Sequence, residues 1–141
     1  MTEVSHRTVL VVDDDPTFRR IWRHVGEQLS LRVVEAAAPE QAWELVQQEP
    51  PDVIVLDVLF PEGSALEFLR QLRQEKGLRN CPVLVCSAVA ERETVLQLAR
   101  EGIQGWLIKP FSLSEAQQRL LRLLGAHESD SAQDEQPTAQ T

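Results

Sequence analysis

Five polar side chains that could act together follow or end short aliphatic runs of the sequence. Asp13, Asp14 and Asp57 are carboxylates, Ser87 carries a hydroxyl, and Lys109 carries an ammonium group. The carboxyl ends of neighbouring parallel strands meet at one edge of a sheet, so these side chains could converge there. Three carboxylates in one crevice repel one another, and such a group must take up a proton or bind a cation.

The expected cation is Mg²⁺, because a few carboxylates hold it while it keeps waters that a phosphate can displace. Two charges on the metal and one on Lys109 balance the charges of the three carboxylates. A phosphoryl group could therefore approach without a large net repulsion. These residue types fit a site that binds a metal ion together with a phosphoryl group.

The elements that must position these residues alternate along the chain. Short aliphatic runs predict buried parallel strands, and apolar residues at three- and four-residue steps predict amphipathic helices. Asp15 is expected to cap the first helix before Pro16, Trp22 to belong to the core, and Gly125 to follow the last helix. Strands are predicted at 8–12, 32–36, 53–57, 82–86 and 105–108, and helices at 16–29, 39–48, 65–72, 94–100 and 112–124.

Strict alternation of strands and helices predicts an α/β fold, with a parallel sheet covered by helices on both faces. Right-handed crossovers favour the flavodoxin-like five-stranded order 2-1-3-4-5. The first and third strands are then neighbours, so Asp13 and Asp14 would face Asp57. One domain is expected over residues 8–125, after an N-terminal extension (1–7) and before an acidic tail (126–141) that is expected to be disordered.

The composition argues against several classes of protein. With 14 Lys and Arg against 22 Asp and Glu, the formal net charge of −8 is unfavourable for binding a nucleic-acid backbone. Two cysteines are too few for a disulfide framework, and the first residues lack the apolar core of a signal peptide. No apolar run approaches the roughly 18 residues of a membrane span. We expect a cytoplasmic protein without membrane or nucleic-acid partners.

Four stretches, in order and at matching spacing, resemble the receiver domain of bacterial two-component response regulators. The resemblance covers about Thr8 to Leu124. The stretches are Val9 to Pro16, Leu56-Asp57 with Pro61, Val83 to Ala88, and Leu107 to Phe111.

The resemblance implies a role for each residue of the acidic group. Asp57 would accept a phosphoryl group from a histidine kinase, a phosphotransfer protein or a small phosphodonor. Asp14, Asp57 and the carbonyl of Leu59 would be Mg²⁺ ligands, and Asp13 would act largely through water. A carboxylate nucleophile that forms an acyl phosphate, while a metal ion and a lysine neutralise charge, agrees with this assignment. The domain would catalyse only its own phosphorylation and dephosphorylation.

The remaining implied roles concern switching. Ser87 would hydrogen-bond the phosphoryl group, Lys109 would pair with its oxygens, and Trp106 occupies the position of a switching Tyr or Phe. The partner-binding face would be formed by the fourth helix, the fifth strand and the fifth helix. The chain is expected to be a stand-alone receiver without an output domain, and a monomer or a phosphorylation-dependent dimer; a linker to a missing output domain is the alternative.

Three departures from the family pattern carry expectations of their own. The indole of Trp106 is larger than a phenol and offers only an N–H donor, which could alter the switch or simply fill a surface groove. Leu59 and Val89 are apolar, and they occupy positions that in this family border the path of the water that attacks the acyl phosphate. Slow hydrolysis of the acyl phosphate is therefore a hypothesis. The loop after Pro61 keeps the family's length, but its glycine, Gly63, stands at another position than in the family.

Two alternatives belong to other classes. The stretch Asp13 to Thr17 satisfies the Asp-x-Asp-x-Thr pattern of haloacid dehalogenase-type phosphatases, in which Asp13 would be the nucleophile and Asp15 the general acid. That hypothesis leaves Asp57 without a clear role and finds no later acidic pair near a strand end. The second alternative is a receiver-like scaffold that binds a partner without phosphorylation.

Overall fold

Strands and helices alternate along the whole described part of the chain. The structure is a computed structural model that describes residues 7–128. The strands are β1 (Thr8–Val12), β2 (Arg32–Ala36), β3 (Val53–Asp57), β4 (Val83–Ser87) and β5 (Gly105–Ile108). The helices are α1 (Pro16–Gln28), α2 (Pro39–Gln48), α3 (Ala65–Gln74), the short 3₁₀ helix η1 (Val89–Glu91), α4 (Arg92–Glu101) and α5 (Leu113–Glu128).

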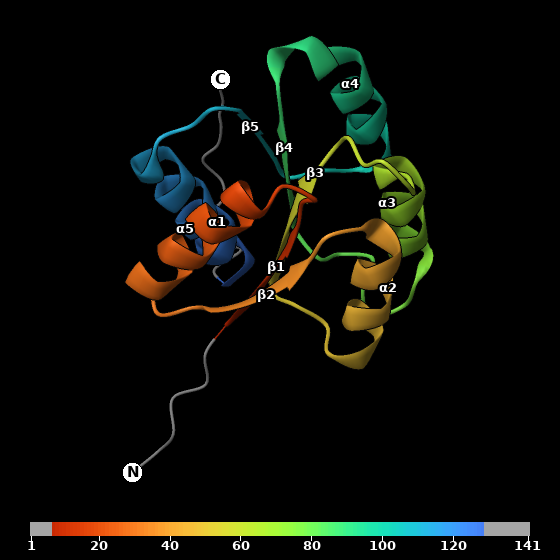
Figure 1. Cartoon of the computed structure of the whole chain (residues 1–141). Helices are drawn as coiled ribbons and strands as arrows, with labels where there is room; N and C mark the ends of the chain where they lie inside the picture. The colour runs from red at the N-terminus through yellow and green to blue at the C-terminus, as the bar shows by residue number, and fades with distance from the viewer. Residues whose placement is uncertain (1–6, 129–141) are drawn as a thin grey trace.

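The five strands form one parallel sheet in the order β2-β1-β3-β4-β5. Helices α1 and α5 lie side by side on one face, and α2, α3 and α4 cover the other (Figure 1). This arrangement confirms the predicted flavodoxin-like fold. It also makes β1 and β3 neighbours, which is where open α/β sheets bind their ligands.

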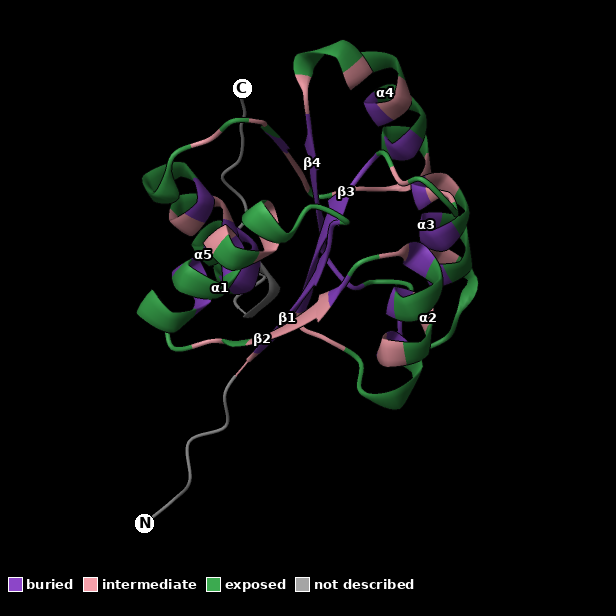
Figure 2. Cartoon of the chain, viewed as in Figure 1, coloured by how far each residue is buried: buried purple, intermediate pink, exposed green. Residues whose placement is uncertain are grey.

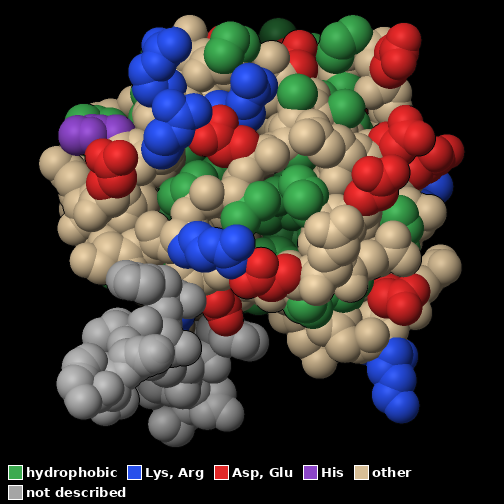
Figure 3. Space-filling model, turned by 60° about the horizontal axis from the view of Figure 1, so that its bottom comes forward, with side chains coloured by type: hydrophobic (Ala, Val, Ile, Leu, Met, Phe, Trp, Pro, Cys, Tyr) green, Lys and Arg blue, Asp and Glu red, His purple; other side chains and the backbone are tan. Residues whose placement is uncertain are grey.

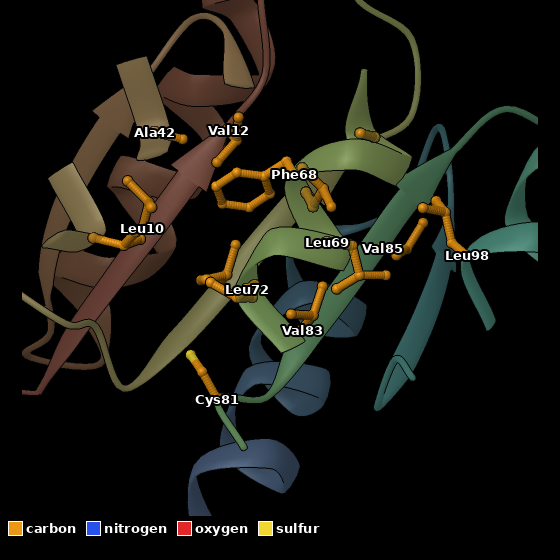
Figure 4. Packing of buried hydrophobic residues seen from close by; sticks show 14 of the residues in the cluster. Leu10, Val12, Ala42, Phe68, Leu69, Leu72, Cys81, Val83, Val85 and Leu98 are labelled. Carbon is orange, nitrogen blue, oxygen red and sulfur yellow. The ribbon is translucent and has the colours of Figure 1, made fainter. Parts of the chain in front are cut away.

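Each face of the sheet buries its own apolar cluster. The central strands β1, β3 and β4 are buried along their length, whereas the helices expose their outer sides (Figure 2). On one face, Phe68, Leu69 and Leu72 of α3 pack among side chains of β1 and β4 (Figure 4). On the other face, Trp22 of α1 is 1% exposed, which confirms it as a core residue.

Most predicted element boundaries agree with the structure to within two residues. The Asp15 carboxylate accepts a hydrogen bond from the backbone N–H of Thr17, as expected of the α1 cap. Strand β4 lies one residue later than predicted, and α4 is two residues longer at its start. The predicted end of the last helix was wrong, because α5 continues through Gly125 to Glu128. A helical glycine costs only about 0.5–1 kcal/mol, which does not by itself end a helix.

The surface carries charges of both signs. Figure 3 shows a face on which Lys and Arg side chains lie near Asp and Glu side chains, around a hydrophobic area. None of the helices in the described part of the chain is long and apolar enough to cross a membrane. Residues 1–6 of the predicted extension (1–7) and residues 129–141 of the predicted tail (126–141) lie outside the described residues.

Candidate functional site

The register of the sheet brings the predicted site residues to one edge. Val12 of β1 pairs with Leu56 of β3, so Asp13 and Asp57, the next residues along each strand, lie at the same level. On the other side of β3, Asp57 pairs with Cys86, which places Ser87 one residue further at the end of β4. The hydrogen-bonded ladder of β4 and β5 continues with the Lys109 N–H donating to the Ser87 carbonyl at 2.8 Å.

Lys109 reaches into the acidic group. Its Nζ lies 3.0 Å from Asp13 Oδ2 and 3.3 Å from Asp57 Oδ1. The peptide bond between Lys109 and Pro110 is cis. Both carboxylates and the lysine side chain are largely shielded from water, with exposed side-chain fractions of 4%, 9% and 14%. These groups are therefore close enough, and dry enough, to influence one another strongly.

The three carboxylates form a group that fits a divalent cation. One oxygen each from Asp13, Asp14 and Asp57 lie within 4.8 Å of one another. Asp13 is engaged through both oxygens, because Oδ1 accepts the Asp15 N–H and Oδ2 accepts from Lys109. Asp14, by contrast, is exposed at the mouth of the group. An all-oxygen donor set that is open to solvent on one side is the kind that Mg²⁺ prefers.

The protonation of Asp57 reflects this crowding. Burial and the negative charge of Asp13 raise the pKa of Asp57 from 3.8 to about 6. The ammonium of Lys109 and the Val58 N–H, which donates to Asp57 Oδ1 at 2.9 Å, oppose that rise. A bound cation would favour the ionised carboxylate, which is the nucleophilic form.

Lys109 stays charged in these surroundings. Burial works against its ammonium form, but the hydrogen bond to Asp13 and the charges of Asp13 and Asp57 outweigh it and raise the pKa of Lys109 above its ordinary value. A permanent positive charge beside Asp57 can attract an anionic group.

Ser87 and Trp106 form a hydrogen-bonded pair between β4 and β5. The indole Nε1–H of Trp106 donates to Ser87 Oγ at 2.9 Å. The serine is fully buried, while the tryptophan is half-buried against the core. Trp106 is thus more than the filling of a surface groove, because it has a polar contact with a predicted site residue.

Two features of the site were not predicted. The centroid of the Phe18 ring lies 4.0 Å from Lys109 Nζ. The Glu91 carboxylate accepts the backbone N–H of Ala88 at 2.9 Å, next to Ser87. The position of Phe18, five residues after Asp13 on the adjoining helix, was the available signal for its contact.

Three residues that depart from the family pattern, Leu59, Val89 and Gly63, follow Asp57 or Ser87 in the sequence. Leu59 is 55% exposed and Val89 is 65% exposed, close in sequence to Asp57 and Ser87. Gly63 has a φ of 91°, and a Cβ there would lie 3.2 Å from Pro39 Cδ. The displaced glycine therefore meets a conformational need of this loop.

The structure is thus that of an α/β domain with an acidic group and a lysine where β1 and β3 end side by side. The family model of the response regulator receiver domain matches residues 9–121, and the chain belongs to this family. It is 35% identical over 126 residues to the KDP operon transcriptional regulatory protein KdpE of Escherichia coli, covering 89% of this chain and 55% of KdpE.

Other relatives differ in how much of their length is matched. Chemotaxis protein CheY-3 of Vibrio cholerae is 29% identical over 113 residues, which is 79% of this chain and 87% of CheY-3. The phosphate regulon transcriptional regulatory protein PhoB of Escherichia coli is 32% identical, over 81% of this chain and 50% of PhoB. The chain thus spans about half the length of relatives such as KdpE and PhoB.

Solved structures agree with the fold. The chemotaxis response regulator CheY4 of Vibrio cholerae superposes with a TM-score of 0.79 at 28% identity, covering 85% of this chain and all of CheY4. A putative response regulator from Chloroflexus aurantiacus gives a TM-score of 0.80 at 26% identity, over 86% of this chain and 99% of that structure.

The family assignment and two contacts of the structure argue against the phosphatase alternative. Its general acid would be Asp15, whose side chain instead caps α1. Its nucleophile would be Asp13, whose two oxygens are both hydrogen-bonded.

Proposed function

We propose that the domain receives a phosphoryl group on Asp57 from a histidine kinase, a phosphotransfer protein or a small phosphodonor, in a Mg²⁺-dependent reaction. The observation that carries the proposal is the position of Lys109, whose Nζ lies 3.3 Å from Asp57 Oδ1 inside the acidic group. This geometry supports the proposal, because a carboxylate beside a fixed positive charge suits a step that moves negative charge.

The transfer conserves atoms and charge. A carboxylate oxygen of Asp57 forms a bond to phosphorus as the phosphorus–nitrogen bond of a phosphohistidine breaks, and the leaving imidazole retains the electron pair and takes a proton. With acetyl phosphate the phosphorus–oxygen bond breaks and acetate leaves. Lys109 would pair with the oxygens of the transferred group, and the Ser87 hydroxyl would hydrogen-bond the product.

Asp14, Asp57 and the Leu59 carbonyl would hold Mg²⁺, with Asp13 acting largely through water. The engagement of both Asp13 oxygens and the exposure of Asp14 support this division of roles. The bound ion would supply positive charge that neutralises the transferred group.

We also propose that Trp106 connects the site to a protein-binding face formed by α4, β5 and α5. The hydrogen bond from the indole N–H to Ser87 Oγ supports this proposal. If the Ser87 hydroxyl turns toward a phosphoryl group, the indole loses this acceptor and can change its position. The downstream partner would be a protein that binds this face. The proposal also includes a cytoplasmic location. The protein would be a monomer, or a dimer that forms on phosphorylation.

The test is to incubate the native protein with Mg²⁺ and acetyl phosphate and to measure its intact mass. One added phosphoryl group is expected in the native protein and none in Asp57→Asn. Binding of beryllofluoride, a phosphoryl analogue, is titrated in parallel, so that slow transfer is distinguished from a missing site.

Two results would contradict the proposal. An adduct that persists in Asp57→Asn and disappears in Asp13→Asn would make Asp13 the nucleophile. A native protein that forms no adduct and binds no beryllofluoride would instead be a scaffold that acts without phosphorylation.

A further inference from the structure

The Lys109 ammonium rests on an aromatic ring that lies outside the four family-like stretches. Its Nζ is 4.0 Å from the Phe18 ring centroid, and it is also 3.0 Å from Asp13 Oδ2 and 3.3 Å from Asp57 Oδ1. A ring face and two carboxylates therefore surround one charge. The side chain of Lys109 is 14% exposed, so little water competes with these contacts.

The ring itself is held in place from two directions. Phe18 lies in the first turn of α1, which begins after the Asp15 cap. On its other side, the ring of Phe111 packs against Phe18 at 5.8 Å and against the buried Trp22 at 5.3 Å between centroids. Phe111 follows Lys109 by two residues, so this aromatic row ties α1 to the segment that carries the lysine.

An aromatic face and a carboxylate interact with an ammonium group in different ways. The aromatic face attracts the positive charge through the ring quadrupole and occupies no hydrogen-bond acceptor position. The ammonium has three N–H donors on a flexible stem. Attraction to Phe18 restricts that stem while leaving donors available to oxygen atoms.

We propose that Phe18 is a positioning residue, whose ring holds the Lys109 ammonium where it meets the phosphoryl group arriving at Asp57. The proposal rests on the proposed function, in which Lys109 pairs with the transferred group. The arrangement would raise the rate of transfer without contact between Phe18 and the phosphoryl group.

The test uses ring electronics at nearly constant shape. Phe18 is replaced by 4-fluoro- and 3,4,5-trifluorophenylalanine, which weaken the ring quadrupole stepwise, and by Tyr and Leu. At saturating Mg²⁺, the rate of adduct formation from acetyl phosphate is expected to fall with each fluorination step. The fall should reach about fivefold in the trifluoro protein and in Phe18→Leu, while Phe18→Tyr keeps the native rate.

Two controls separate positioning from folding. Trifluorophenylalanine at Phe68, which packs in the core on the opposite face of the sheet, should leave the rate unchanged. In protein without Mg²⁺ or phosphodonor, the ring current of Phe18 should shift the ε-CH₂ proton resonances of Lys109 upfield. That shift should survive in Phe18→Tyr and vanish in Phe18→Leu.

The outcomes distinguish this proposal from the function on which it rests. A native adduct that forms at one rate across the whole ring series overturns the positioning role alone. Lys109 ε-CH₂ resonances that Phe18→Leu does not move also overturn it. No adduct and no beryllofluoride binding in the native protein overturn the proposed function, and this proposal with it.

Discussion

The proposed chemical role of Asp57 comes with an electrostatic cost to the stability of the fold. Because burial and Asp13 raise the pKa of Asp57 from 3.8 to about 6, the folded protein holds this proton more tightly than the unfolded chain. The resulting stability is fully present below pH 3.8 and is lost as the pH rises through about 6. At neutral pH without a cation, the ionised Asp57 therefore weakens the fold.

Asp57→Asn removes the charge at every pH and should stabilise the Mg²⁺-free protein at pH 7. A rise in pKa of this size corresponds to roughly 3 kcal/mol. Solvent screening at the mouth of the site reduces the expected gain to on the order of 1–2 kcal/mol. Urea unfolding at pH 7 and pH 4 measures it, with the exposed Glu62→Gln as control. A gain that is as large at pH 4 as at pH 7 would refute the electrostatic origin.

The apolar side chains of Leu59 and Val89 bear on the expected lifetime of the proposed acyl phosphate. Both side chains are exposed, lie two residues after Asp57 and Ser87 in the sequence, and can offer no hydrogen bond to an attacking water. We predict that the double substitution Leu59→Asn with Val89→Glu shortens the half-life of the adduct severalfold, because these side chains can orient water. The mass of the adduct is followed after removal of the donor. An equal or longer half-life in the variant would count against this role of Leu59 and Val89.

Among the secondary-structure elements, α1 packs closely against β2 at Gly26, where there is no room for a side chain. A Cβ at Gly26 would lie 2.2 Å from Val33 Cγ2 on β2, so Gly26→Ala should destabilise the fold by about 1–3 kcal/mol. Gly125 in α5 is the matched control, since a Cβ there meets nothing within 4 Å. Gly125→Ala should instead stabilise by about 0.5–1 kcal/mol. Thermal or urea unfolding measures both, and the same sign in both variants would contradict the packing.

The hydrogen bond between Trp106 on β5 and Ser87 on β4 can be measured as a coupling free energy in a double-mutant cycle. Trp106→Phe leaves the buried Ser87 hydroxyl without its donor, and Ser87→Ala leaves the indole N–H without its acceptor. Each should cost about 1–3 kcal/mol, and the double mutant should cost less than the sum by about 0.5–1.5 kcal/mol. Additive effects in urea unfolding would show that the hydrogen bond contributes nothing.

The sequence predicted elements better than contacts. Alternating strands and helices specify the strand order, because right-handed crossovers leave few topologies, and the order then places Asp13 beside Asp57. The end of α5 could not be predicted from Gly125, because the cost of a glycine inside a helix is too small to end the helix by itself. The contact of Phe18 with Lys109 depends on how α1 packs against the segment after β5, which apolar periodicity does not encode.

At the largest scale, the chain is a receiver domain whose candidate site lies at the carboxyl ends of its strands. Asp57 ends β3, and Asp13 and Lys109 directly follow β1 and β5, so the sheet brings the three residues together. Residues 44 or more apart in sequence thus form one charged group, so the site exists only in the folded domain. Its aromatic support comes from both ends of the chain, through α1 and the segment before α5.

Asp57 itself is expected to carry the phosphoryl group, and chemical trapping can locate it directly. After incubation with Mg²⁺ and acetyl phosphate, the protein is treated with borohydride, which reduces an aspartyl phosphate to homoserine. Peptide mass spectrometry then locates the modified residue. Homoserine at position 57, absent when Mg²⁺ is chelated, is the expected result; homoserine at position 13 or 14, or at no aspartate of a protein that gained the phosphoryl mass, would contradict the assignment.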